Sequence, residues 1–374
     1  MAGRLAIAVC VVVVLVLPTL VTAQEIPAAV DLLRESQYDL SEGGRAFLLE
    51  EADQAAFFLL GELHFTKEIP DLLTGLWPDL WRSGYRHVAA EMSPWAANRV
   101  EFPRDGAATS FIGLWTAAEV ELVTGLTNEG APSVLWGSDV EVLSPHLVLR
   151  DLAGKNRENP HLKAMVEATA GGYRRSQAYL LGELLERAAA VQPELSEDLH
   201  TFGNLAHTFA IETDRLEGER LRASSRREEA MKELFLSHYS AHAEAAGAKV
   251  LVRLGRNHLH RGIDRRGVST LGNFIAETAA ARGLTSFHLA AFGAGGRIRS
   301  GFATVDADET SHDPAFELLA SLARHPATVF DLRPARPALH AILLNKRSAA
   351  ERSLVYWADS YDAIICFREV TPLR

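Results

Sequence analysis

The sequence predicts an α/β fold with a central, mixed but mostly parallel β-sheet flanked by helices. Three observations support this prediction. Short runs of consecutive apolar residues recur along the chain, and several of them end in charged residues. Stretches with helical spacing of apolar residues separate these runs, and a mostly helical stretch covers about residues 160–246. Strands that are apolar at every position are typical of parallel sheets, whose two faces are both covered by helices.

The first 23 residues are expected to lie outside this fold, as a secretory signal peptide. Arg4 supplies a short positive region, an apolar stretch follows from Leu5 to Leu17, and Val21-Thr22-Ala23 resembles a cleavage site of small residues. The apolar stretch is shorter than the roughly 20 residues of a membrane-spanning helix, which favours cleavage over an uncleaved anchor. We therefore expect cleavage near Ala23, export to the periplasm or the outside, and a single domain at residues 24–374.

Composition restricts the partners of this domain. The chain is 48% hydrophobic and 23% charged, which are ordinary values for a globular protein with a large core. Of its 38 basic and 48 acidic residues, one basic residue lies in the first 23 positions, which leaves residues 24–374 with a net charge of −11. This acidic balance argues against nucleic acid or anionic membrane as the main partner. The domain retains one cysteine, Cys366, so we expect no internal disulfide, and we expect no membrane span in the mature chain.

The first strand carries the most informative residues. Apolar residues run from Ala55 to Leu60 and end directly in Gly61-Glu62-Leu63-His64. Side chains two positions apart in an extended chain point to the same face, so Glu62 and His64 are expected to lie together. A carboxylate and an imidazole thus stand at the carboxyl end of a strand, where open α/β sheets hold their ligands.

A helix and a second strand follow. The stretch from Lys67 to Gly84 places five large apolar side chains on one stripe, with a proline in its first turn and a glycine at its end. The apolar run His87–Ala90 then ends at Glu91. This order predicts a right-handed βαβ unit that brings Glu91 to the same sheet edge as Glu62.

Two later runs end in the same way. Ser133–Trp136 is followed by Gly137 and Asp139, and Val250–Leu254 is followed by Arg256, Asn257 and His258. Further strands, some of them antiparallel, are expected at Ser286–Phe292, Ala327–Leu332, His340–Leu344 and Ala363–Phe367.

The helical stretch 160–246 is predicted to be an insertion that caps the sheet. Its segment Arg215–Leu236 is highly charged, with only scattered apolar residues. A solvated helical hairpin or cap has this pattern, and a lid over the strand ends is the alternative.

The residues at the strand ends form a candidate site. If the strands are parallel neighbours, five of these residues meet at one edge: Glu62, His64, Glu91, Asp139 and His258. Such a cluster can activate water by general acid–base catalysis, or it can hold a divalent metal, with His64, Glu91 and His258 as candidate ligands. Asp139 could instead cap the segment that follows it.

His260 and Arg256 extend this candidate site. His258 and His260 form a His-x-His pair beside Arg256, which could bind an anionic group of a substrate, although a solvated basic loop has the same pattern. The sequence contains no Gly-x-Ser-x-Gly elbow, no Walker-type loop and no dinucleotide motif. Water is therefore the expected attacker.

The order of these motifs resembles erythromycin esterase-like proteins and the wider superfamily of ChaN haem-binding proteins and Tiki/TraB proteases. The similarity rests on Gly61–His64 and Glu91-Met92-Ser93, and on the later segments Trp136–Asp139, Arg227–Met231, Leu254–Gly262 and Tyr361–Glu369. The resemblance implies one catalytic domain with Glu62, His64, Glu91 and a histidine of residues 256–260 in the site. It implies metal-free water activation in the esterase branch, a divalent metal in the Tiki branch, and haem in the ChaN branch.

This chain departs from the macrolide esterases at three motifs. One residue separates Glu62 from His64, as in the ChaN-like pattern, and Arg256 stands where the esterases have a histidine. Leu234 stands where an asparagine is expected three residues after Met231. The leading hypothesis is an exported hydrolase acting on an ester, lactone or amide bond of a small molecule or peptide. Its catalytic residues would be Glu62, His64, Glu91 and His258, with Glu62 or His64 as the base, and its substrate-binding residues would be Asp139, Arg227, Arg256 and His260. The alternative is a haem- or divalent-metal-binding protein without esterase activity.

Overall fold

The computed structural model describes residues 25–102, 116–128, 133–244, 247–300, 303–309, 312–341 and 347–373. The predicted signal peptide lies outside these ranges. Within them, no helix combines the length and the apolar character needed to cross a membrane.

Eight strands of the described residues form one sheet in the order β1-β9-β10-β6-β2-β5-β3-β4. The strands of this sheet are β1 Gln37–Asp39, β2 Phe57–Glu62, β3 Tyr85–Ala90, β4 Leu135–Gly137, β5 Lys249–Gly255, β6 Ser286–Gly293, β9 Ala327–Asp331 and β10 Ala363–Phe367. All neighbours from β10 to β4 pair in parallel, whereas β9 pairs antiparallel with both β10 and β1. The predicted mixed, mostly parallel sheet is confirmed.

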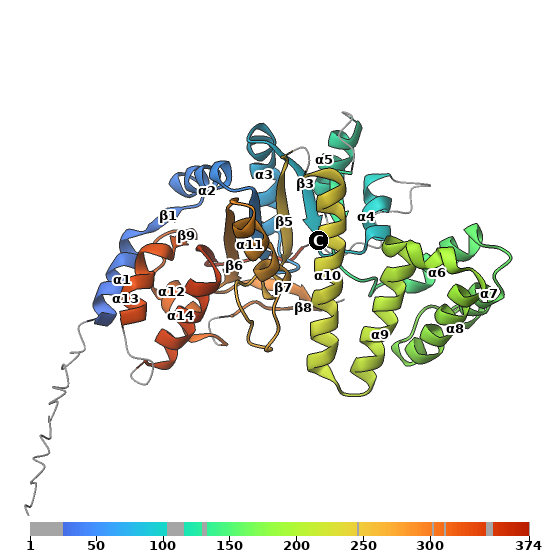
Figure 1. The fold of residues 1–374 in the computed structure, drawn as a ribbon. Helices are drawn as coiled ribbons and strands as arrows, with labels where there is room; N and C mark the ends of the chain where they lie inside the picture. The colour runs from blue at the N-terminus through green and yellow to red at the C-terminus, as the bar shows by residue number, and fades with distance from the viewer. Residues whose placement is uncertain are drawn as a thin grey trace, which may run out of the picture.

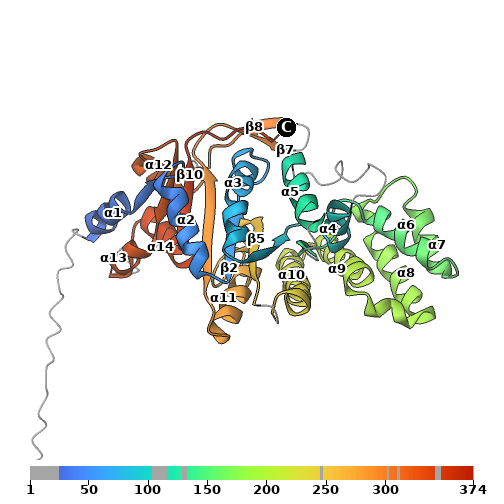
Figure 2. The same ribbon diagram turned by 90° about the horizontal axis from the view of Figure 1, so that it is seen from above.

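Two sets of helices cover the two faces of this sheet (Figures 1 and 2). Apolar side chains of β2 alternate between them, because Phe57 and Leu59 pack toward one set while Phe58 and Leu60 pack toward the other. The first set is α1 Glu25–Glu35, α10 Arg220–His242, α11 Leu271–Ala281, α12 Pro314–Leu322, α13 Arg336–Ala341 and α14 Ala349–Ser360. The second set is α2 Gly43–Gln54, α3 Glu68–Arg82, α4 Pro94–Glu101 and α5 Ala117–Asn128.

The helical stretch has two parts. Its last helix, α10, packs on the sheet through Met231, Phe235 and Tyr239. The other helices share a separate apolar cluster and lie beyond the β4 edge of the sheet, at the right of Figures 1 and 2. They are α7 Pro160–Ala168, α8 Ala178–Val191 and α9 Asn204–Leu216, and α6 Pro145–Lys155, which precedes the predicted stretch, joins the same cluster.

Most predicted strands are observed within two residues of their expected ends, and one is wrong. His340 and Ala341 belong to α13, and the remainder of His340–Leu344 lies outside the described residues. A short apolar run fits a buried helix as well as a strand, and Leu339 is buried from α13. Three short strands were not predicted, namely β1 and the separate hairpin of β7 Arg297–Ser300 and β8 Ala303–Asp306.

Candidate active site

The sheet order places the predicted strand-end residues side by side. Strands β2, β5, β3 and β4 are consecutive and parallel, so their carboxyl ends share one edge. The side chains that follow them are joined by short contacts, as the next paragraphs describe. The structure therefore brings together the five residues of the predicted cluster, Glu62, His64, Glu91, Asp139 and His258. Arg227, which was predicted to bind substrate, lies beside them.

His64 lies at the centre of the cluster, between two carboxylates. Its Nδ1 is 2.8 Å from Glu62 Oε1, and its Nε2 is 3.3 Å from Glu91 Oε2. Glu62 is 4% exposed, whereas the His64 side chain is 32% exposed. His64 is thus the member of this trio that faces solvent.

Both carboxylate oxygens of Glu91 accept further hydrogen bonds, one of them from Arg227. Arg227 of α10 donates through Nη2 to Glu91 Oε1 at 2.9 Å and to Asp139 Oδ2 at 2.5 Å. The backbone N–H of Gly255 donates to Glu91 Oε2 at 2.7 Å. Arg227 and Asp139, predicted to bind substrate, therefore hold Glu91 in place.

Glu62 belongs to a buried ion-pair network that the sequence analysis missed. Arg253 of β5 donates through Nε to Glu62 Oε2 at 2.5 Å and through Nη1 to Glu119 of α5. Arg253 is 3% exposed and Glu119 is 0% exposed. An arginine within the apolar run Val250–Leu254 was the available signal, because a charge buried in a strand needs a carboxylate partner.

Two glycines allow the strand ends to approach one another. A Cβ on Gly255 would lie 2.6 Å from His64 Nε2 and 3.1 Å from Glu91 Oε2. A Cβ on Gly61 would lie 2.9 Å from the Cα of Arg256. Both positions therefore exclude larger residues for steric reasons.

These contacts fix the charges of the trio. Burial opposes charge on His64, but hydrogen bonds to Glu62 and Glu91 outweigh it and raise the pKa of His64 to about 10. Burial also opposes charge on Glu62, yet Arg253 and His64 hold the pKa of Glu62 below its ordinary value. The pKa of Glu91 is well below its ordinary value, because the neighbouring histidines and arginine outweigh burial. At neutral pH the trio is an imidazolium between two carboxylates.

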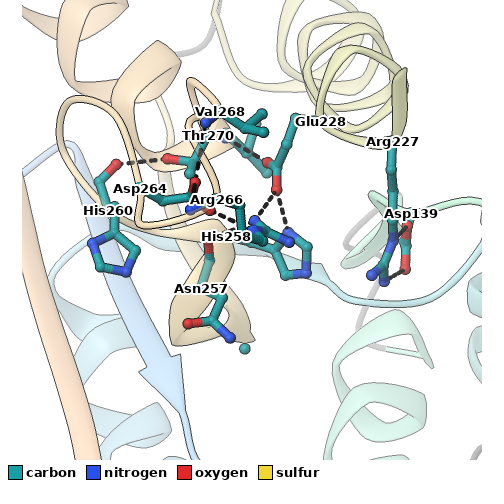
Figure 3. A network of polar contacts seen from close by, with 12 residues as sticks. Asp139, Arg227, Glu228, Asn257, His258, His260, Asp264, Arg266, Val268 and Thr270 are labelled. Atoms are coloured by element: carbon teal, nitrogen blue, oxygen red, sulfur yellow. Dashed lines mark hydrogen bonds and ion pairs between the residues drawn. The ribbon is translucent and has the colours of Figure 1, made fainter. Parts of the chain in front are cut away.

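His258 approaches the cluster from the short helix Arg256–His258 that follows β5. Its Nδ1 is 2.6 Å from Glu228 Oε1, and its Nε2 is 3.6 Å from Glu91 Oε1. Figure 3 shows Glu228 of α10 reaching both His258 and Arg266, with Arg227 and Asp139 on the other side of α10. Glu228 was not among the predicted site residues, although it follows Arg227 directly in the sequence.

Arg256 and His260 do not contact the cluster. Arg256 pairs with Glu309 and donates to the carbonyl of Ala291. His260 is 1% exposed, and its Nε2 is 3.2 Å from the hydroxyl of Tyr356. Arg256 and His260 were predicted to bind substrate. In the structure Arg256 forms an ion pair with Glu309, and His260 contacts Tyr356 of α14.

Comparison with known proteins identifies the fold. The erythromycin esterase EreC in its open conformation aligns with 91% of this chain and 97% of its own, at 15% sequence identity and a TM-score of 0.62. The chain has the erythromycin esterase fold. A succinoglycan biosynthesis protein covers 93% of this chain and 98% of its own at 13% identity and a TM-score of 0.61. A Bacillus cereus protein covers 92% and 98% at 11% identity and a TM-score of 0.60.

Other comparisons add little. No family model matches the chain, and no curated protein matches it by sequence. A haem-binding ChaN protein of Campylobacter jejuni aligns at a TM-score of 0.29, which is too low to support a shared fold. At 11–15% sequence identity, similarity to these structures establishes the fold of the chain. The chemistry of the site has to be argued from its own residues.

The side chains of the cluster are engaged with one another and with arginines. The described residues contain no group of three or more His, Cys, Asp or Glu side chains placed to hold a metal ion. Glu62 accepts from Arg253, and Glu91 accepts from Arg227 and the Gly255 N–H. Both ring nitrogens of His64 face carboxylates, so His64 would have to break one of these contacts to bind haem or a metal ion.

Proposed function

We propose that this chain is an exported hydrolase that uses the Glu62–His64–Glu91 cluster to hydrolyse an ester, lactone or amide bond by attack of water. The observation that carries the proposal is the partly exposed imidazole ring of His64, which has a carboxylate at each ring nitrogen. A fixed positive charge beside solvent can stabilise the negative oxygen that forms when water adds to a carbonyl group.

The geometry revises the expected division of roles. Glu62 is neutralised by Arg253, and His64 has no free lone pair while both carboxylates are ionised. In the proposed reaction His64 therefore acts as an electrostatic stabiliser, and Glu62 and Glu91 keep it charged and oriented. Arg227 and Asp139 support Glu91 from the opposite side.

The fold likeness supports the choice of ester or lactone substrates first. A protein described as an erythromycin esterase has this architecture over nearly its whole length. The one-residue gap between Glu62 and His64 and the arginine at position 256 distinguish this chain from macrolide esterases. We therefore propose the ester, lactone or amide class and no particular macrolide.

The test is a hydrolysis screen on ester, lactone and peptide panels with purified protein. We expect His64→Ala to lower kcat by about 10²–10³-fold, the usual loss when one group that stabilises an oxyanion is removed. His340→Ala is the matched control, because His340 is a surface histidine 2.7 Å from Asp359. Equal rates for the wild type and His64→Ala would refute the assigned site.

The same samples test the alternative of haem or metal binding. A Soret band on haem titration that His64→Ala abolishes, or a stoichiometric metal in native mass spectrometry, would favour that alternative if all panels are inactive.

Export is a second part of the proposal and has its own test. Mass spectrometry of the protein recovered from outside the cytoplasm should give an N-terminus at Gln24. An intact Met1 or a purely cytoplasmic protein would contradict export.

A further inference from the structure

We infer that Glu228 positions His258 as the general base of the site, so that the two histidines have opposite roles. His258 would take the proton of the attacking water, and His64 would stabilise the oxyanion. This inference rests on the proposed hydrolase function. It assigns Glu228 as a positioning residue and identifies which histidine has a nitrogen available for water.

The two histidines differ in what their ring nitrogens contact. Both nitrogens of His64 face carboxylate oxygens, at 2.8 and 3.3 Å, so both carry hydrogens. Only Nδ1 of His258 is engaged, at 2.6 Å from Glu228 Oε1. Its Nε2 lies 3.6 Å from Glu91 Oε1, a distance at which a protonated His258 forms an ion pair with Glu91 and a neutral His258 makes no hydrogen bond to it. An ionised Glu228 requires the hydrogen on Nδ1, which leaves the lone pair on Nε2.

Glu228 is held rigidly, as a positioning group must be. It is 1% exposed, and its Oε2 accepts the backbone N–H of Leu271 at the start of α11, at 3.0 Å. Its Oε1 also accepts from Arg266 Nη2 at 3.0 Å. Arg266 in turn donates to the carbonyl of Asn257 and to Asp264, so the loop that carries His258 is tied to α10 (Figure 3).

The proton balance of the step is simple. His258 Nε2 accepts a proton from water as the water oxygen forms a bond to the carbonyl carbon. The resulting oxyanion lies beside His64. When the bond to the leaving oxygen or nitrogen breaks, the proton on His258 passes to that atom, and His258 returns to its starting state.

The decisive variant is Glu228→Gln, because the structure fixes how the new amide must sit. The Leu271 N–H is a backbone donor that cannot turn away, so the amide oxygen takes the place of Oε2 and the NH₂ group takes the place of Oε1, while the partly exposed Arg266 side chain, which also donates to Oε1, turns toward Asp264. The NH₂ group then donates to His258 Nδ1 and forces the ring hydrogen onto Nε2, where it removes the base. In a Ser-His-Asp triad the equivalent change lowers kcat by about 10⁴-fold through the wrong tautomer.

The experiment reads the tautomer and the rate separately. Nitrogen-15 NMR of the imidazole rings should show His258 carrying hydrogen on Nδ1 in the wild type and on Nε2 in Glu228→Gln, with His64 doubly protonated in both. We expect kcat to fall by about 10²–10⁴-fold with KM changed less than threefold. Glu228→Asp keeps the charge and should restore the Nδ1 hydrogen and part of kcat.

The control is Glu229→Gln, which removes the same charge from the neighbouring, exposed position of α10. It should match the wild type in both measurements. An Nε2 hydrogen on His258 in the wild type, or a folded Glu228→Gln protein with unchanged kcat, overturns the inference and leaves the hydrolase proposal intact. If no panel substrate is cleaved, the hydrolase proposal and the base role fail together, while the NMR result still decides the Glu228–His258 pairing.

Discussion

Replacing Arg253 with methionine should be the most damaging single change in the buried network behind the site. Methionine keeps most of the aliphatic volume of the arginine, so the lost packing is small. Glu62 and Glu119, 4% and 0% exposed, would be left without the cation they share. Glu62 would keep His64 as a partner, and Glu119 would keep the backbone N–H and the hydroxyl of Thr116. The expected loss is therefore that of one partner of a buried ion pair, about 3–5 kcal/mol.

The assay is urea unfolding at 25 °C, at about pH 7 and about pH 4.5. Burial already raises the pKa of Glu119 above its ordinary value with the arginine present, and loss of the arginine raises the pKa of both Glu119 and Glu62, so the penalty is full at neutral pH and shrinks as protonation neutralises Glu119. Arg34→Met is the control, because Arg34 pairs with Asp31 on the surface and should change stability by less than about 1 kcal/mol. A loss below about 1 kcal/mol for Arg253→Met, or a loss that is the same at both pH values, would refute this reasoning.

Three further predictions concern the same sheet edge. Because the pKa of His64 rises from 6.5 to about 10 on folding, its contribution to stability is complete below pH 6.5 and disappears as the pH passes 10. The difference in unfolding free energy between the wild type and His64→Gln should therefore narrow between about pH 6 and about pH 10.5 in urea titrations. Gly255→Ala should lower the free energy of unfolding by about 1–3 kcal/mol and should also lower kcat, because its Cβ would overlap His64 and Glu91. An unchanged kcat would contradict the close approach of the strand ends. Gly137→Ala places a Cβ 2.3 Å from backbone atoms of the β3–α4 connection and should lower the free energy of unfolding in urea by at least about 3 kcal/mol. Its control is Gly154→Ala, at a position of α6 with open space around it, which should raise the free energy of unfolding by about 0.5–1 kcal/mol.

Local patterns in the sequence were sufficient to predict the strands that carry the site. The apolar runs before Glu62, Glu91, Asp139 and Arg256 are strands, and their parallel order brings three of these acids to one edge. Strand-end position is a local property, so periodicity and the right-handed crossover rule can indicate it.

The partners of those residues depend on tertiary contacts that no local pattern contains. Glu119 and Glu228 lie 57 and 166 positions beyond Glu62, on helices whose rotation decides whether their side chains reach the sheet. For the same reason the sequence placed Arg256 in the site, whereas in the structure its side chain turns toward Glu309. The charge state of His64 also could not be predicted, because it depends on a second carboxylate from another strand.

The position of β10 determines when this protein can fold. It is the last strand along the chain, yet it lies inside the sheet between β9 and β6, and β1 in turn pairs only with β9. The four strands of the active-site half are complete once Gly255 has been made, but the other half stays open until Ala363–Phe367 is available. Until β10 is made, the edges of β6 and β9 that it pairs with are exposed, and unpaired strand edges favour aggregation. Removal of residues 363–374 should therefore prevent folding of the sheet, although these residues are not part of the site around His64.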